Sequence, residues 1–285
     1  RAAGEAPEEE AGWLRRVAEA CRRVPRLPAR NLHEGLQSIA LIHLAIAIEG
    51  HGLSVSIGLP DRVLAPFAEE AEADPERASF LAAAFALKIA MNTYQGRGSK
   101  TQAITVGGRD AAGLCCCNAV TRAMLRGFDR VAVSDPHLFL RWHPGIDHGV
   151  FEQAMDMLHR GRSMPLLIND EPTIQGFVDA GVDPQDAAEY AVMGCNELGI
   201  PGKLFDSALP VTCTWIDAEI LRNHLLSGGA DGASSVEQIV AGLEQPYAAM
   251  GAKLDERQAI QRSIADTMPT PLTPALMWGS PARGA

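Results

Sequence analysis

The alternation of short strand candidates with helical segments constrains the fold of this chain more than any other feature. The residues from His137 to Trp142 and from Pro165 to Ile168 are candidates for short strands. Each is followed by a segment with helical spacing, 147–160 and 172–180 respectively. This alternation is typical of α/β folds, in which helices pack on a sheet. We therefore expect an α/β fold.

Further helices are expected on both sides of this region. Asn31 can cap a helix that stops at Gly50. That helix is apolar nearly all round toward its end, so it should be buried. The other expected helices begin at Trp13 or cover residues 76–94, 210–226 and 235–267, and the proline-containing tail from Pro269 should be a loop. The fold should therefore be rich in helices.

Composition and charge exclude several classes of function. The 285 residues are 47% hydrophobic, which is enough for a sizeable core in one large or two ordinary domains. A formal net charge of -10 argues against nucleic acid or an anionic membrane surface as the main partner, and favours a small molecule. The longest apolar run, 39–48, is too short to span a bilayer, and no secretory leader is recognisable. The six cysteines lack the density of a disulfide scaffold, so we expect reduced thiols in a cytoplasmic protein.

The segment 194–197 contains a thiol and a carboxylate, Cys195 and Glu197, separated by one residue. A short helix capped by Asp183 should end near Ala191 and leave Cys195 in a loop. Alone, such a pair is weak evidence, because a buried thiol near a surface acid is common. A loop cysteine beside a carboxylate that reaches the same ligand is nevertheless suited to hydrogen or proton transfer. We therefore select Cys195 and Glu197 as the candidate catalytic residues.

Three other groups of residues have weaker claims. The run from Cys115 to Cys117 suggests a metal site, but consecutive helical residues diverge too far to bind one ion, so we expect small packing residues there. His143 and His148 could line a pocket, although ordinary surface histidines are favoured. The acidic segment 169–171 follows a strand and could face a site, or serve a helix N-terminus. We predict no metal ion and no bound cofactor.

Five blocks of sequence, taken together, carry a family resemblance. They are Gly58-Leu59-Pro60-Asp61-Arg62 with Pro66; Thr105-Val106-Gly107-Gly108 with Asp110 and Asn118; Arg141-Trp142-His143; Pro165 with Asn169-Asp170-Glu171; and Tyr190 with Gly194-Cys195-Asn196-Glu197 and Pro201-Gly202-Lys203. With these blocks in order, the chain resembles the pyruvate formate-lyase-like glycyl radical enzymes over most of its length.

The resemblance implies a partial α/β barrel of the glycyl radical enzyme type, with residues 1–285 forming part of its catalytic domain. In that family a glycine-centred radical, installed by a separate radical-SAM iron-sulfur activating enzyme, draws hydrogen from a loop cysteine. The resulting thiyl then draws hydrogen from a small polar substrate. Cys195 matches that cysteine, and Glu197 matches the carboxylate that transfers a proton. The resemblance also implies that the thiol loop lies inside a closed barrel, and it leaves a homodimer open.

Four departures from the family pattern refine these expectations. Asn196 stands where pyruvate formate-lyase has a second cysteine, which disfavours formate acetyltransferase-like chemistry and favours the dehydratase, decarboxylase and related lyase branches. Leu59 and Leu209 replace an arginine and a carboxylate, which disfavours a polyol substrate. The radical loop, of the form Arg-Val-x-Gly-Tyr, is missing from these residues, so the isolated chain should be inactive unless a partner supplies the glycine.

Two alternatives stay open at this point. The chain could be a catalytically inactive remnant or a binding subunit of the same fold. It could also be a thiol-dependent transferase in which Cys195 is an ionic nucleophile, and that hypothesis predicts rapid alkylation of Cys195 in air.

Overall fold

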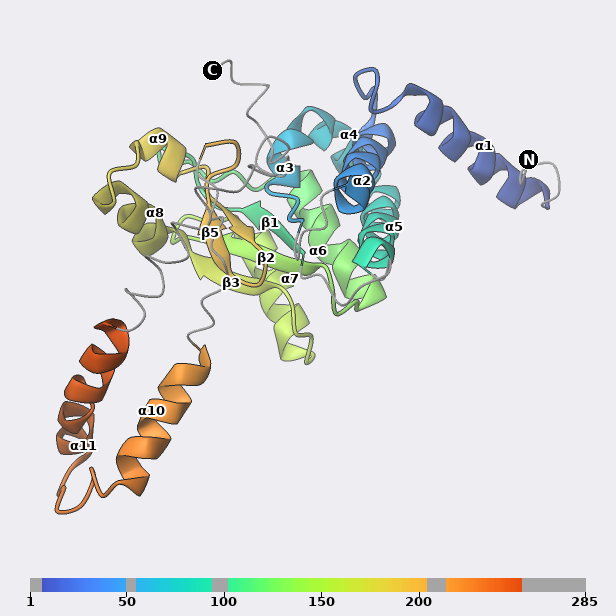
Figure 1. Ribbon diagram of the computed structural model, residues 1–285. Coiled ribbons are helices and arrows are strands. Elements are labelled where there is room, and N and C mark those ends of the chain that lie inside the picture. Colours follow the sequence, from blue (N-terminus) through green and yellow to red (C-terminus); the bar gives the residue numbers. More distant parts are fainter. Residues whose placement is uncertain (1–6, 50–54, 94–101, 204–213, 253–285) are drawn as a thin grey trace. The chain divides into compact units, whose positions relative to one another are not determined.

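The computed structural model describes residues 7–49, 55–93, 102–203 and 214–252 (Figure 1). It contains two compact units, one formed by Arg1–Asp206 with Pro271–Ala285 and the other by Ser207–Thr270. Each unit is described by itself. Four expectations fall outside the described residues: the loop from Pro269, the helical turn at 210–213, the later part of the predicted helix, 253–267, and the substituted position Leu209.

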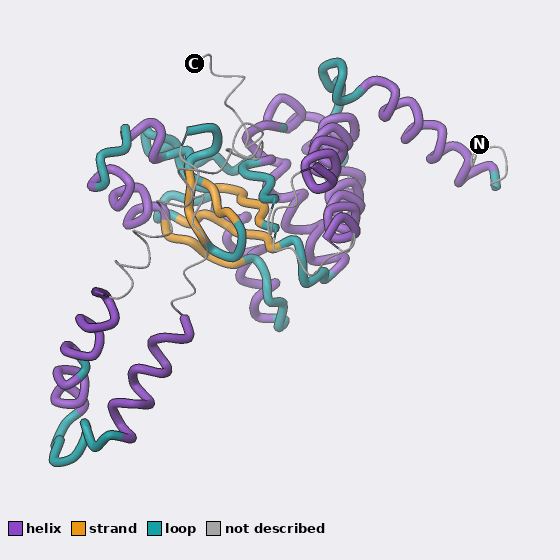
Figure 2. Tube along the Cα trace, viewed as in Figure 1, coloured by secondary structure: helices purple, strands orange, loops and turns teal. Residues whose placement is uncertain are grey.

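A three-stranded parallel sheet lies at the centre of the first unit (Figure 2). Its order is β1 (Ala103–Gly107), β2 (His137–Trp142), β3 (Leu166–Asn169), with Ala103 opposite His137 and Phe139 opposite Leu166. The helices α6 (Ala119–Val131) and α7 (His148–His159) connect successive strands. Parallel strands joined by helices confirm the α/β expectation, and both predicted strands are present. Strand β1 was not predicted, and α8 (Asp170–Asp179) begins two residues earlier than predicted.

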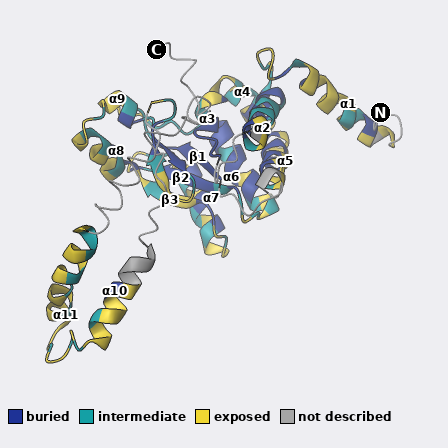
Figure 3. Cartoon of the chain, viewed as in Figure 1, coloured by how far each residue is buried: buried dark blue, intermediate teal, exposed yellow. Residues whose placement is uncertain are grey.

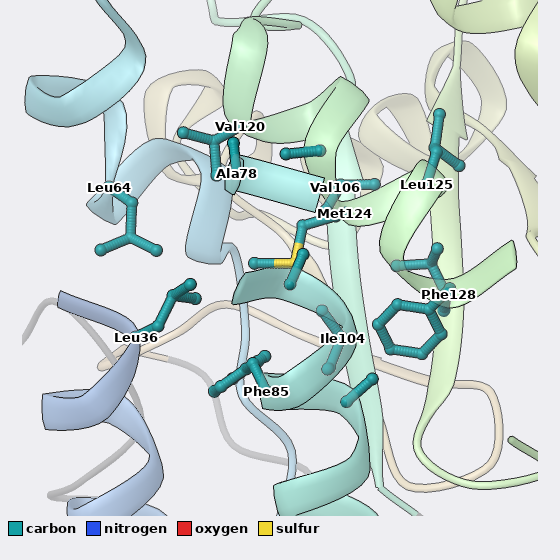
Figure 4. Packing of buried hydrophobic residues seen from close by; sticks show 14 of the residues in the cluster. Leu36, Leu64, Ala78, Phe85, Ile104, Val106, Val120, Met124, Leu125 and Phe128 are labelled. Carbon is teal, nitrogen blue, oxygen red and sulfur yellow. The ribbon is translucent and has the colours of Figure 1, made fainter. Parts of the chain in front are cut away.

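The main core lies between the sheet and a layer of helices formed by α2 (Leu32–Glu49), α5 (Pro75–Thr93) and α6. Figure 4 shows Leu36 of α2, Phe85 of α5 and Met124 and Phe128 of α6 in one cluster with Ile104 and Val106 of β1. The cap predicted for α2 is confirmed, because the Glu34 N–H donates to the Asn31 side chain at 2.9 Å. Burial of these apolar faces is the principal stabilising contribution to the unit.

The remaining helices of the first unit are short or peripheral. They are α1 (Glu8–Arg23), α3 (Pro60–Val63), the 3-10 turn Ala65–Phe67, α4 (Ala68–Ala73) and α9 (Pro184–Ala187). The second unit contains α10 (Thr214–Leu226) and α11 (Val236–Gly242), and the helix predicted over 235–267 is interrupted at Leu243. Pro246 lacks the N–H that would bond the Gly242 carbonyl, and its ring crowds that carbonyl, which explains the interruption. No helix among the described residues is long and apolar enough to cross a membrane.

A small antiparallel hairpin follows α9, with strands β4 (Ala191–Met193) and β5 (Glu197–Gly199). The helix predicted to end near Ala191 ends at Ala187, so its predicted end is wrong. Ala191 instead begins β4, because the apolar residues of this strand are buried against the parallel sheet. Figure 3 shows strands β1 and β2 of that sheet as buried. Strand segments of three residues are too short for periodicity to reveal.

Candidate active site

Cys195 lies at the tip of the hairpin turn between β4 and β5. Gly194 precedes it with φ +60, a left-handed conformation that favours glycine. The cap predicted upstream is present, because the Gln185 N–H donates to the Asp183 carboxylate at 2.8 Å. The expectation of a loop cysteine is therefore confirmed, although strands rather than helices flank it.

The Glu197 carboxylate closes this turn. Its Oε2 atom accepts a hydrogen bond from the Cys195 N–H at 2.9 Å and another from the Asn196 N–H at 3.1 Å. The Met193 and Glu197 backbones are opposite one another in the hairpin register. The carboxylate is thus held against the backbone of the residue that bears the thiol, and the structure brings the two candidate residues together.

Both candidate side chains are exposed in the described part of the chain. The expectation that the thiol loop lies inside a closed barrel is therefore not met within these residues. The described strands form a three-stranded parallel sheet and a two-stranded hairpin, which is not a closed barrel.

A buried polar network lies where the parallel strands end. Arg141, at the end of β2, donates through Nε to Asp170 Oδ1 at 2.8 Å and through Nη2 to Asp170 Oδ2 at 3.0 Å. The Tyr190 hydroxyl donates to Asp170 Oδ1 at 2.7 Å, and Arg141 Nη1 donates to the Tyr190 carbonyl at 3.1 Å. All three side chains are fully buried. The network connects β2 and β3 to the residue that precedes the hairpin.

The charges in this network compensate one another. Burial alone would lower the pKa of Arg141, but its hydrogen bonds and attraction to Asp170 raise that pKa above its ordinary value. Burial raises the pKa of Tyr190, so its phenol stays neutral and acts as a donor. The acidic segment 169–171 therefore has a structural role at Asp170, while Asn169 caps α8 by accepting from the Glu171 N–H at 3.2 Å.

The two histidines selected from the sequence differ in environment. His148 is exposed, as favoured, but His143 is only 2% exposed, so the surface interpretation is wrong for it. His143 Nδ1 accepts from the Gly145 N–H at 3.2 Å, and among the described residues its buried Nε2 atom has no hydrogen-bond partner. Burial lowers the pKa of His143, so the imidazole is neutral near pH 7.

The cysteine run does not lie on a helix. Cys115, Cys116 and Cys117 lie in the loop before α6, where Cys115 forms an isolated bridge with Arg109. The helical interpretation is wrong because Asn118 caps α6 and so fixes the start of the helix beyond the cysteines. Among the residues that the structure describes, no group of three or more His, Cys, Asp or Glu side chains could hold a metal ion.

One buried carboxylate was not chosen as a candidate site residue in the sequence analysis. Asp61 is fully buried and its Oδ2 atom accepts from the Gly107 N–H and from Thr121 Oγ1, each at 2.7 Å. Burial raises the pKa of Asp61 despite these two donors. The carboxylate thus fixes the end of β1 against the start of α6. Its position after Pro60 in a helical first turn gave no signal of burial.

Comparison with known proteins gives a consistent picture. A family model described as pyruvate formate lyase-like matches residues 2–244. The probable dehydratase YbiW of Escherichia coli strain K12 is 29% identical, with 71% of this chain and 27% of that protein covered. The (2S)-3-sulfopropanediol dehydratase of Klebsiella oxytoca is 24% identical, over 82% of this chain and 32% of that protein. An isethionate sulfite-lyase of Oleidesulfovibrio alaskensis is 27% identical, over 67% of this chain and 25% of that protein.

Solved structures agree with the sequence relatives. A glycyl radical enzyme from Archaeoglobus fulgidus has a TM-score of 0.64 at 26% identity, covering 70% of this chain and 28% of that one. Hydroxyproline dehydratase from Clostridioides difficile has a TM-score of 0.72, covering 97% of this chain and 38% of that one. Its sequence is 20% identical, so this similarity shows the fold alone. The chain therefore spans about a quarter to a third of the length of the curated relatives described above.

Proposed function

The chain belongs to the pyruvate formate lyase-like family, and we propose that it supplies the thiyl-bearing side of a glycyl radical lyase or dehydratase. The relatives described above are dehydratases and a lyase, and one similar solved structure is a glycyl radical enzyme, which supports an enzyme of that class. The observation that carries the finer proposal is the position of Cys195 at the tip of a hairpin turn whose backbone is hydrogen-bonded by Glu197.

Cys195 is the hydrogen-abstracting residue in this proposal. Once its thiol has lost a hydrogen atom to the glycine-centred radical, the thiyl takes a hydrogen atom from a substrate carbon. The C–H bond breaks homolytically, an S–H bond forms, and the unpaired electron passes to the substrate carbon. A neighbouring group then leaves, and the thiol returns a hydrogen atom to the product radical, which regenerates the thiyl.

Glu197 transfers the proton that the departing group requires. A carboxylate that is anchored to the turn by two N–H donors is held at a fixed distance from the thiol-bearing residue. Donating a proton to a leaving hydroxyl would release water, and withdrawing one from a substrate hydroxyl would assist release of another group. Either role needs a carboxylate beside the abstracting sulfur.

We propose that other parts of the barrel cover the exposed side of this hairpin in the active enzyme. Radical intermediates need a site closed to water and oxygen. The radical glycine and an activating enzyme would be provided outside these 285 residues, so the isolated chain would be inactive. The substrate class is a small polar organic molecule. The names of two relatives described above, and a similar solved structure of 1,2-propanediol dehydration in Roseburia inulinivorans (26% identity over 70% of this chain), supply three probes: (2S)-3-sulfopropanediol, isethionate and 1,2-propanediol.

The test is anaerobic turnover of these three probes by the complete enzyme, with the radical glycine on the same polypeptide or on a partner. The glycyl radical is first quantified by electron paramagnetic resonance. We expect Cys195→Ala to abolish turnover at unchanged radical yield, while Cys21→Ala, which removes an exposed thiol from α1, retains it. Retained turnover in Cys195→Ala would contradict the proposal.

Two further outcomes would favour the alternatives. A fully activated wild-type enzyme that turns over none of the probes favours an inactive remnant or binding subunit. Rapid alkylation of Cys195 in air, together with activity that needs no radical, favours an ionic thiol transferase.

A further inference from the structure

The edge of strand β4 that faces away from β5 is held by side chains. Successive N–H groups of a strand point to opposite edges, so those of Val192 and Gly194 share one edge. The Val192 N–H donates to Thr105 Oγ1 at 2.9 Å, and the Gly194 N–H donates to Ser56 Oγ at 2.9 Å. Two side-chain hydroxyl groups therefore accept hydrogen bonds from the two successive N–H groups on this edge.

A third side-chain hydrogen bond holds the backbone at Tyr190, just before β4 begins. Arg141 Nη1 donates to the Tyr190 carbonyl at 3.1 Å, so the backbone groups of residues 190, 192 and 194 are all bound by side chains. The last of these hydrogen bonds is one residue from Cys195. The position of the thiol relative to the parallel sheet is thus set by contacts that do not involve its own side chain.

The two hydroxyl-bearing residues are themselves firmly placed. Thr105 is the central residue of β1 and is fully buried, opposite Phe139 in the sheet register. Ser56 is buried and its Oγ atom also accepts from the Ala103 N–H at 3.2 Å. The adjoining backbone is tied to β1, because the Ile57 N–H donates to the Ala103 carbonyl at 2.8 Å. Neither hydroxyl can move without disturbing β1.

We propose that Ser56 and Thr105 are positioning residues for the radical chemistry, since their hydroxyl groups fix the Cys195 hairpin against the sheet. This inference rests on the proposed function of Cys195. We call these two residues the hydroxyl anchors. Hydrogen-atom transfer depends on a sulfur-to-carbon distance that is correct to a fraction of an ångström, and a loop that is free to shift loses rate. Removing a hydroxyl leaves an N–H donor without its acceptor, and the hairpin gains freedom at that point.

The test uses substitutions that remove each hydroxyl with little change in volume. Ser56→Ala and Thr105→Val remove the acceptors, and Thr105→Ser keeps the hydroxyl and should restore the wild-type behaviour. The matched control is Ser79→Ala on α5, because Ser79 is also fully buried and its hydroxyl has no hydrogen-bond partner within the described structure. The control removes a buried hydroxyl without touching the hairpin.

The first measurement is amide hydrogen exchange in the 285-residue chain. We expect the Gly194 amide in Ser56→Ala and the Val192 amide in Thr105→Val to exchange about fivefold faster or more, the factor that corresponds to one lost hydrogen bond. The control and Thr105→Ser should exchange as wild type does. Unchanged exchange at both amides would overturn the anchor geometry, whatever the activity of Cys195.

The second measurement is made on the complete, activated enzyme with whichever of the three probes it turns over. We expect kcat to fall about tenfold or more in Ser56→Ala and Thr105→Val, with KM and glycyl radical yield unchanged and a larger deuterium isotope effect on C–H cleavage. A merely structural role would lower the radical yield in parallel with kcat, and that result would overturn the proposal. Failure of the proposed function of Cys195 is distinguished from failure of the anchor proposal, because in the first case Cys195→Ala stays active. The exchange measurement still tests the hydroxyl anchors in that case.

Discussion

At the scale of single residues, the polar network of Arg141, Asp170 and Tyr190 determines how the strand ends meet the hairpin. Arg141 is fully buried and its charge is matched by Asp170 at 2.8 Å. Such a pair adds little net stability compared with apolar packing, but breaking it leaves a buried charge unmatched. The network therefore specifies one arrangement of the strand ends and of Tyr190, which precedes β4.

This network gives a prediction at the residue scale. Asp170→Asn should lower the free energy of unfolding by about 3 kcal/mol, because it leaves the Arg141 guanidinium buried beside a neutral amide. Chemical denaturation followed by circular dichroism measures the change. The control is Asp129→Asn, since Asp129 pairs with the half-exposed Arg160 and Arg162, and such pairs contribute about 1 kcal/mol or less. Equal effects of the two substitutions would contradict the assignment.

At the scale of elements, the close approach of α5 and α6 builds the core beneath β1. Gly127 of α6 makes this possible, because a Cβ atom there would lie 2.7 Å from the Ala82 side chain and from the Ala83 backbone nitrogen. The α5 backbone cannot move aside to make room for a methyl group, as the end of a flexible side chain could. The two helices would have to separate, and the apolar contacts seen in Figure 4 would loosen.

We therefore predict that Gly127→Ala lowers the free energy of unfolding by about 1 to 3 kcal/mol, the usual cost of overpacking a core. Thermal or chemical denaturation provides the measurement. Gly176→Ala on α8 is the matched control, because nothing lies within 4 Å of its Cβ position. Alanine there should stabilise the helix by up to about 1 kcal/mol. An equally stable Gly127→Ala variant would show that the α5 and α6 contact is loose.

The elements also show where sequence reasoning succeeds. Strand β2 and helix α7 were predicted because each is long enough for its periodicity, and the Asn31 cap of α2 carries a local chemical signal. Strand β1 was missed because its five residues are all buried, so no polar alternation marks them. The hairpin was missed because its strands have three residues each and are held by distant Ser56 and Thr105, which no local pattern reveals.

At the scale of the whole molecule, the motif at 194–197 located the candidate site, but its surroundings depended on tertiary contacts. The pairing of Glu197 with the Cys195 backbone follows from a tight turn at Gly194, whose φ is +60. The loop position of Cys115 to Cys117 follows from the Asn118 cap of α6, a local signal that the sequence interpretation did not use. The burial of His143 depends on tertiary packing, which no local pattern reveals. The chain covers about a quarter to a third of its curated relatives, and within it both catalytic candidates are exposed on one side of the hairpin.

The most direct measurement of the central claim is the fate of substrate deuterium in the complete, activated enzyme. The probe that is turned over carries deuterium at the abstracted position, and the reaction runs in ordinary water. If Cys195 is the hydrogen carrier, deuterium moves from the substrate carbon to the sulfur, and the thiol returns it to the product radical at the neighbouring carbon that lost the departing group. The account predicts this transfer in wild type and no deuterated product from Cys195→Ala at equal glycyl radical yield. Product from Cys195→Ala that carries the transferred deuterium would contradict it.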